Sequence, residues 1–297
     1  MKKSFGEKIF DFVNGLLLTI MASSMIYPFI YVLAISLNEA ADSNKGGIFL
    51  FPRKFTLDSY RIVMENHDLL NTALVSVSRT VLGTVLTVLC SAMFAYVFTK
   101  PKFIFYKPMK LIFFIAMFLG GGALIPVYML YRSLGLLNSF AVYILPFLVN
   151  LWFVILFRTY YTQMPKGLEE AALVDGANEL RIFFTIILPL STPMIATVGL
   201  FAAVDQWNSW RDTLFFTSKD SLKTLQFLMM EVMQKAEAGS MITRAAAKMG
   251  KVRKVRSVDP VSVRMSITIV TTIPIVLVYP FLQKYFMKGM LIGSMKG

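Results

Sequence analysis

The sequence predicts an all-α protein that crosses a membrane about six times and carries a short helix in a cytoplasmic loop. Three observations favour this fold class. Of the 297 residues, 56% are hydrophobic and the mean hydropathy is +0.64, which is too apolar for a soluble domain. Several apolar runs are long enough to cross a hydrocarbon core of about 30 Å at about 1.5 Å per residue. One short loop, residues 99–110, holds four lysines and no acidic residue, which is typical of a cytoplasmic loop.

Six apolar segments fit transmembrane helices and predict a single membrane domain over the whole chain. They are residues 12–37, 71–98, 111–131, 139–157, 186–204 and 262–286. The first segment follows three lysines, as in a signal peptide, but it is too long and lacks a small-residue cleavage site. We therefore expect a retained span with a cytoplasmic N-terminus. In the third segment, Gly-Gly-Gly at residues 120–122 and Pro126 interrupt regular helix and permit close helix packing.

The charges of the loops predict the orientation of the spans. Because lysine-rich short loops stay inside, the loop at residues 99–110 is expected in the cytoplasm. The loop at residues 158–185 and the C-terminal tail then lie in the cytoplasm as well. The polar segment at residues 207–261 lies outside, although its ten basic residues outnumber its five acidic ones. Long loops translocate largely regardless of charge, so this excess does not reverse the topology. Within it we expect helices at residues 222–234 and 245–249.

The cytoplasmic loop at residues 158–185 contains a spaced pattern that continues into the fifth segment. Its characteristic positions are Glu170, Ala171, Ala172, Gly176, Ile186, Leu188 and Pro189. Pro165 suits a helix start, and acidic residues in the first turn favour the positive end of the helix dipole. The two alanines give high helix propensity and little bulk. Gly176 can adopt a positive φ and end the helix. The pattern predicts a slim helix able to enter a cleft on another protein, the alternative being an ordinary amphipathic surface helix.

Polar residues in or beside two spans are candidates for a solute pathway. Arg79 lies about two turns into the second segment, where a charge is costly unless it faces protein or water. Snorkelling to the outer interface is the alternative. Gln206, Trp207 and Asn208 follow the fifth segment. Amides beside an indole can hydrogen-bond and stack on a sugar ring, although Trp residues also anchor membrane interfaces.

Several classes of chemistry find no support in the residues. A single cysteine, Cys90, excludes an intramolecular disulfide, and the single histidine, His67, sits in a polar loop, so no metal site is expected. The sequence has no G-x-x-x-x-G-K-[ST] loop, which excludes ATP binding by that route. Paired His, Asp or Glu at span depth, which an intramembrane enzyme needs, are absent from the predicted spans. Asp205 at a span end is the sole acidic residue there, which disfavours an ion-coupled secondary transporter.

The pattern around Glu170 and Gly176 resembles the EAA loop of permease subunits of ABC importers. With the six spans, the Gly-Gly-Gly and Pro of the third, and the ending Gly-Ser-Met-Lys-Gly, nearly the whole chain resembles the carbohydrate-importer permeases related to the maltose-transporter inner subunit. The resemblance extends in particular to LplC-like oligosaccharide permeases. The long basic outer segment departs from that family pattern.

The resemblance implies a multi-pass subunit of a two-permease pore in the cell membrane, with both termini cytoplasmic. Two cytoplasmic ATPase subunits and an external solute-binding protein would complete the importer, which would carry a sugar or oligosaccharide. Closure of the ATPases would push on the Glu170 helix and tilt the spans. No bond chemistry, cofactor or nucleic acid is implied. A permease for amino acids or peptides is the alternative within ABC import.

Two basic or terminal segments add further expectations. The tail at residues 288–297 is expected to contact the ATPases, a disordered end being the alternative. Residues 244–256 contain six basic residues and no acidic one, which would attract an anionic partner. That partner would be an acidic surface of the binding protein, lipid headgroups or an anionic sugar, and Arg79 would continue such a path into the membrane.

Overall fold

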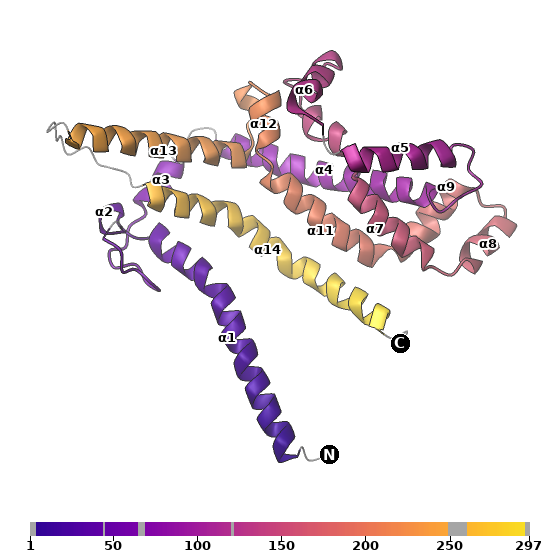
Figure 1. Cartoon of the computed structure of the whole chain (residues 1–297), viewed down its shortest axis with the longest axis horizontal. Helices are drawn as coiled ribbons and strands as arrows, with labels where there is room; N and C mark the ends of the chain where they lie inside the picture. Colours follow the sequence, from indigo (N-terminus) through magenta and orange to yellow (C-terminus); the bar gives the residue numbers. More distant parts are fainter. Residues whose placement is uncertain (1–3, 44, 65–68, 120–121, 249–259, 295–297) are drawn as a thin grey trace. The chain divides into compact units, whose positions relative to one another are not determined.

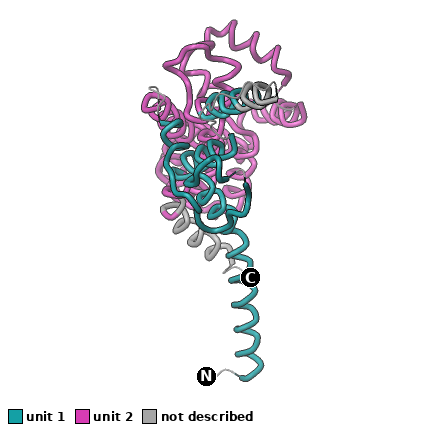
Figure 2. The backbone as a smooth tube through the Cα atoms, turned by 90° about the vertical axis from the view of Figure 1, so that its left-hand side faces the viewer, with its two compact units in different colours: residues 1–67, 229–274 teal, residues 68–228, 275–297 magenta. Residues whose placement is uncertain are grey.

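A computed structural model describes residues 4–43, 45–64, 69–119, 122–248 and 260–294 (Figure 1). The chain divides into two compact units (Figure 2). Unit 1 consists of residues 1–67 and 229–274, and unit 2 consists of residues 68–228 and 275–297. Each unit has buried apolar side chains of its own.

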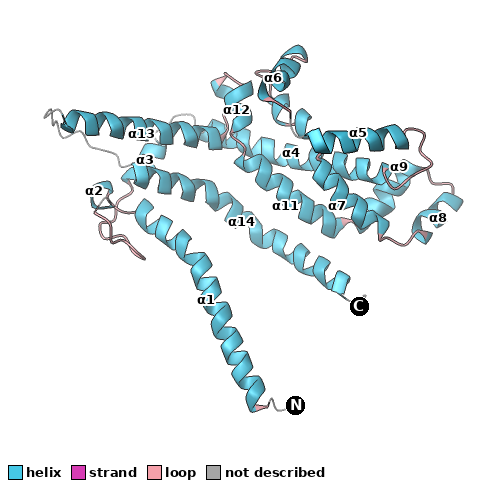
Figure 3. Cartoon of the chain, viewed as in Figure 1, coloured by secondary structure: helices cyan, strands magenta, loops and turns pink. Residues whose placement is uncertain are grey.

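Within the described ranges every regular element is a helix, which confirms the predicted all-α class (Figure 3). Three stretches there are continuous, long and apolar enough to cross a membrane. They are α1 (Phe5–Ser36), α4 (Leu69–Val97) and the part Pro260–Val278 of α14, whose full extent is Pro260–Ser294. Two bent pairs of helices raise the count among the described residues to five if each pair is one span.

Unit 1 is built on α1 and on the first part of α14. It also contains α2 (Ala40–Ser43), α3 (Asp58–Met64) and the part of α13 (Leu225–Lys248) from residue 229 onwards. In α1 the buried side chains are confined to residues 34–36, at the C-terminal end. There Ala34 and Ile35 pack with Ile48, and Met265 of α14 packs against them. The rest of α1 is an apolar helix with exposed side chains.

Unit 2 is organised around α4, which packs along α7 (Leu151–Thr162) and α11 (Thr192–Asn208) (Figure 1). Small side chains make this close approach possible, because Ala92 and Ala95 on α4 are fully buried. The main core of the unit joins these alanines to Phe153 and Phe157 of α7, and to Val198 and Ala202 of α11. The predicted second span, residues 71–98, therefore corresponds to the central helix of the unit.

The third predicted span, residues 111–131, corresponds to two shorter helices. They are α5 (Tyr106–Leu119) and α6 (Leu124–Ser133), separated at the glycine run. Gly122 has a φ of +73°, which an L side chain rarely adopts. Residues 120 and 121 lie outside the described part of the chain.

The fourth and fifth predicted spans are bent pairs. The fourth joins the short helices η1 (Phe140–Tyr143) and η2 (Leu145–Phe147) to α7 with a bend of 45°. The fifth begins with the short helical segments α9 (Glu179–Ile182), η3 (Phe183–Ile187) and α10 (Leu188–Leu190), and it turns by 82° into α11. Pro189 and Pro193 lie at this second bend, where a missing backbone donor interrupts the helix.

The predicted outer segment, residues 207–261, is largely helical where it is described. The last turn of α11, α12 (Arg211–Phe216), η4 (Asp220–Leu222) and α13 (Leu225–Lys248) follow one another. Of the helices expected at 222–234 and 245–249, residues 225–234 and 245–248 belong to the single longer helix α13, whereas Leu222 ends η4 and residue 249 lies outside the described residues. The basic residues at 251–256 lie outside the described residues, so their predicted role is not addressed by the fold.

Candidate functional site

The loop with the spaced pattern folds into a short helix, α8 (Gly167–Val174). Glu169 and Glu170 lie in its first turn, where backbone N–H groups favour negative charge. Glu170 and Ala171 are exposed, whereas Ala172 is half-buried and packs against the main core of unit 2. One face of α8 therefore rests on the spans, and another is open to a partner.

Gly176 ends α8 with a backbone conformation that only glycine adopts readily. Its φ is +78°, and no heavy atom lies within 4 Å of the place where a Cβ would stand. The Gly176 N–H donates to the Leu173 carbonyl at 3.1 Å, and the Ala177 N–H donates to the Ala172 carbonyl at 2.9 Å. These two bonds form the Schellman motif that terminates helices with a left-handed residue. The sequence prediction for Gly176 is confirmed, and the requirement is for backbone conformation rather than for space.

The remaining positions of the pattern lie beyond this turn. Asn178 starts the next helix, because its side-chain oxygen accepts from the Arg181 N–H at 2.8 Å. Ile186 and Leu188 are half-buried against the main core, and Pro189 is exposed at the bend. The pattern thus fixes both the helix and its attachment to the following span.

A lysine just beyond the C-terminal end of α4 contacts both sides of the Gly176 turn. Lys100 Nζ donates to Glu169 Oε2 at 2.5 Å and lies 3.1 Å from Glu179 Oε2. The Tyr96 hydroxyl donates to the same Glu179 oxygen at 2.7 Å, and the ammonium stands 4.7 Å from the centre of the Tyr96 ring. Partial burial lowers the pKa of Lys100, but the hydrogen bonds with Glu169, Tyr96 and Glu179 outweigh it and hold that pKa above its usual range.

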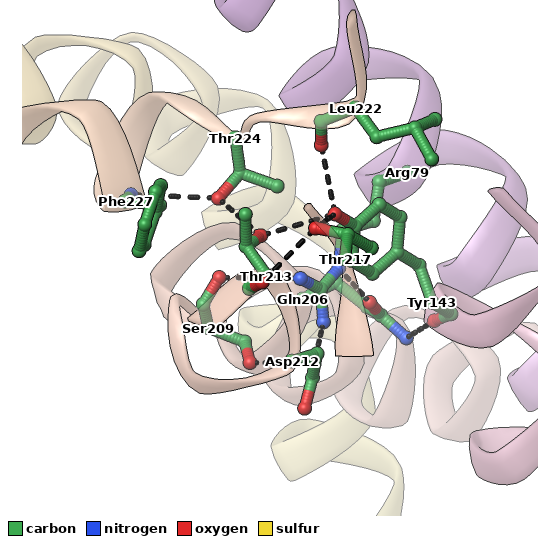
Figure 4. Close-up of polar contacts among 10 residues, drawn as sticks. All are labelled: Arg79, Tyr143, Gln206, Ser209, Asp212, Thr213, Thr217, Leu222, Thr224 and Phe227. Atoms are coloured by element: carbon green, nitrogen blue, oxygen red, sulfur yellow. Dashed lines mark hydrogen bonds and ion pairs between the residues drawn. The ribbon is translucent and has the colours of Figure 1, made fainter. Parts of the chain in front are cut away.

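The second candidate site surrounds Arg79, which is 1% exposed. Its Nε donates to Gln206 Oε1 at 2.8 Å, and its Nη1 donates to the Ser209 carbonyl at 3.2 Å (Figure 4). Its Nη2 forms a hydrogen-bonded ion pair with Asp212, and its guanidinium lies 4.6 Å from the centre of the Tyr143 ring. Arg79 therefore faces protein at span depth, and the snorkelling alternative does not describe this structure.

A second layer of hydroxyl groups fixes the partners of Arg79. Tyr143 donates to the Leu222 carbonyl at 2.7 Å, and its hydroxyl lies 3.1 Å from that of Thr213 (Figure 4). Ser209 Oγ donates to Asp212 Oδ2 at 2.8 Å. These bonds join η1, α12 and η4, so the network closes one end of the α4 and α11 pair.

Gln206 reaches Arg79 by crossing close over α4. A Cβ built on Gly83 would lie 2.8 Å from both Cδ and Nε2 of Gln206. Gly83 is therefore required for space, unlike Gly176. A buried side-chain amide needs a hydrogen-bond partner. The close approach to Gly83 places the Gln206 amide where Arg79 Nε can donate to it.

A cavity of about 300 Å³ opens beside this network. Its lining residues are Arg79, Thr87, Phe147, Asn150, Phe153, Ala202, Asp205, Gln206, Ser209 and Asp212. Two of the predicted pathway residues, Arg79 and Gln206, are thus brought together. Trp207 is buried, and Asn208 accepts from Gln226 Nε2 at 3.3 Å, and neither is among the lining residues.

Sequence reasoning missed Asp212, Tyr143 and Lys100 as members of a site. Asp212 stands 133 positions after Arg79 and falls in the segment predicted to lie outside the membrane. Tyr143 reads as one more apolar residue of a span, and Lys100 served only as a topology signal. A search for an acidic partner for the buried arginine would have pointed to the few acidic residues close to a predicted span end.

Comparison with known proteins gives consistent matches. The family described as binding-protein-dependent transport system inner membrane component matches residues 81–292. The polygalacturonan/rhamnogalacturonan transport system permease protein YtcP of Bacillus subtilis (strain 168) is 33% identical over 294 residues, which is 98% of this chain and 99% of that protein. Protein LplC of the same organism is 34% identical over 299 residues, which is 100% of this chain and 98% of that protein.

A solved structure matches over a similar extent. It is a bacterial ABC transporter involved in the import of the acidic polysaccharide alginate. The matched chain superposes with a TM-score of 0.75 at 28% identity, covering 96% of this chain and 99% of that one. The helical architecture described above is therefore that of a known membrane assembly.

Proposed function

The chain belongs to the family of binding-protein-dependent transport system inner membrane components, and from this premise we propose that it forms part of the membrane pathway of an ATP-driven importer of sugars or oligosaccharides. It is a permease subunit and not an enzyme. Its relatives are carbohydrate permeases, which leaves the amino-acid or peptide alternative without support. Sugar importers of this kind work with a second permease, an ATPase and a binding protein.

The proposed coupling element is α8. The observation that supports it best is the exposed Glu170 and Ala171 on a helix whose end is set by Gly176. A narrow, exposed helix that carries an acidic side chain is suited to insert into a cleft of the ATPase subunit. The half-buried Ala172, Ile186 and Leu188 then connect that contact to the main core of unit 2.

The test is a matched pair of glycine variants in the reconstituted importer. Gly176→Val requires a β-branched residue at a φ of +78° and should abolish the rise in ATP hydrolysis caused by the loaded binding protein. Gly199→Val is the control, because that glycine is helical and has open space at its Cβ. Normal stimulation of ATP hydrolysis in Gly176→Val would refute the proposed coupling role. Loss of stimulation in both variants would show that the positive φ of Gly176 is not the cause of the effect.

The proposed pathway contact of this subunit is the cavity beside Arg79. Its walls offer Asn150, Gln206 and Thr87 to sugar hydroxyl groups. Arg79 already faces Asp212, and Asp205 adds a second carboxylate to the lining. The cavity therefore holds no uncompensated cation for a sugar acid.

An anionic oligosaccharide remains our proposed cargo for a different reason. The similar solved importer carries the acidic polysaccharide alginate, and the chain has a formal net charge of +13. We place the recognition of negative charge at the basic segment 244–256 and at the binding protein. Uptake of a labelled uronate oligomer should then be outcompeted by unlabelled uronate oligomers and only weakly by neutral ones of equal length, whereas equal competition would refute the anionic cargo.

Both termini are proposed to lie in the cytoplasm of a cell bearing this importer in its inner or plasma membrane. Support comes from the lysine-rich loop at 99–110, which lies at the same end of α4 as α8. A cysteine placed at exposed Lys102 should react with a membrane-impermeant reagent only after the vesicles are opened to expose the cytoplasmic side.

A further inference from the structure

We infer that Lys100 is a positioning residue that fixes the coupling helix α8 to the end of α4, so that displacement of α8 carries α4 with it. The inference rests on the proposed coupling role of α8. It concerns how that movement enters the spans, which the exposed Glu170 alone does not explain.

The contacts of Lys100 favour a mechanical role. One ammonium group contacts Glu169, in the first turn of α8, and Glu179, in the first turn of α9. These two helices flank the Gly176 turn. A single side chain therefore fastens both arms of the turn to the same point on α4.

The contacts of Lys100 with Glu169 and Glu179, here called the clamp, are partly shielded from water. The side chains of Lys100 and Glu169 are 22% and 26% exposed, whereas that of Glu179 is 52% exposed. Charge-assisted hydrogen bonds in such surroundings are stronger than those of fully exposed pairs. Removing the ammonium would also leave two carboxylates close to each other, since both lie within 3.1 Å of the same nitrogen.

The helix that carries the clamp reaches the cavity. Between Arg79 and Lys100 the chain is almost entirely helical, and at about 1.5 Å per residue this stretch spans about 30 Å. Along it α4 packs against α7 and α11, and at its far end Arg79 contacts Gln206 and Asp212. A rigid, continuously packed element of this kind can carry energetic coupling between two sites.

The test compares Lys100→Met with Lys102→Met in the assembled importer in proteoliposomes. Lys102 is an exposed lysine two positions away and is the matched control. In Lys100→Met, solute transported per ATP hydrolysed should fall by roughly fivefold, at the lower end of coupling effects between sites. The ATPase subunits should still co-purify, and Lys102→Met should behave as the unaltered protein.

Charge inversion separates positioning from mere stabilisation. The triple variant Lys100→Glu, Glu169→Lys, Glu179→Lys should recover most of the transport per ATP, while Lys100→Glu alone should not. An unaltered ratio in Lys100→Met, or no recovery in the triple variant while its complex assembles, would overturn the inference. Gly176→Val in the same assay keeps the two proposals distinct, because a loss there with none in Lys100→Met supports the coupling helix and refutes the clamp.

Discussion

Arg79 lies in the first half of α4, Lys100 lies just beyond its C-terminal end, and the two residues hold their charges in different ways. Arg79 is sealed in protein, with an amide, a backbone carbonyl and a carboxylate as partners. Lys100 is partly hydrated and contacts two carboxylates from two short helices. A buried ion pair has a fixed geometry because breaking it is costly, whereas a hydrated one can open and reform. The contacts of Arg79 are therefore expected to be insensitive to solvent conditions, whereas the attachment made by Lys100 is expected to respond to salt.

The largest effect that would test this contrast is expected at Arg79. Arg79→Met leaves Asp212 buried without its cation and should destabilise the protein by about 3–5 kcal/mol. Because paired apolar replacements of buried ions are often neutral, Arg79→Met with Asp212→Leu should recover most of that loss. The measurement is thermal unfolding of the detergent-solubilised complex. Equal losses in the single and double variants would show that the ion pair is not the source of the effect.

A smaller effect is expected at Gly83, which gives Gln206 room to reach Arg79. Gly83→Ala places a Cβ about 2.8 Å from the Gln206 amide and should cost about 1–3 kcal/mol through overpacking. In the Gln206→Ala background the same substitution should cost little, so a double-mutant cycle should reveal the coupling. Additive costs in that cycle would contradict the close contact.

Salt should distinguish the two ends of the helix. At 1 M salt the screening length is about 3 Å, which weakens partly hydrated pairs more than sealed ones. Transport per ATP should therefore decline with salt in the unaltered importer and change less in Lys100→Met. The decrease in unfolding temperature caused by Arg79→Met should be independent of salt. A steeper decline in Lys100→Met would contradict the assignment of the salt effect to the clamp.

The smallest effect should come from pH. The folded-state pKa of Lys100 lies above its ordinary value of about 10.4. The stabilisation it provides is therefore complete below that ordinary value and is lost only as pH rises through the higher folded-state pKa. The difference in transport per ATP between the unaltered importer and Lys100→Met should be constant from about pH 7 to pH 9. A difference that disappears within this range would show that another group controls the clamp.

The local features of the molecule were predictable because local chemistry determines them. Gly176 must tolerate a positive φ, and the prolines at 189 and 193 must interrupt helix, whatever surrounds them. The exposed helix around Glu170 follows from propensity and dipole effects in the same way. The predicted number of spans, by contrast, stays a prediction, since α5 and α6 are each too short to qualify alone.

Contacts between distant residues were not predictable from patterns. Arg79 was recognised as costly, but its partner Asp212 follows a bend and an extra helical turn that hydropathy does not reveal. The fifth predicted span ends at residue 204, whereas α11 continues to Asn208 and so draws Gln206 into the core. Similarly, nothing in a run of four lysines distinguishes Lys100 from its neighbours. Only the fold identifies the carboxylates that meet it.

The exposed side chains of α1 bear on the order in which the protein is made. Over its most apolar 18 residues, none is buried against the rest of the described chain, and its buried side chains are confined to residues 34–36. A helix whose backbone bonds are all internal needs no later segment to be stable in lipid. Because α1 precedes every residue of unit 2 in the chain, it can enter the membrane as a complete span before unit 2 has been synthesised. The insertion of α1 can therefore be independent of the cooperative packing around α4, which follows as a separate, later event.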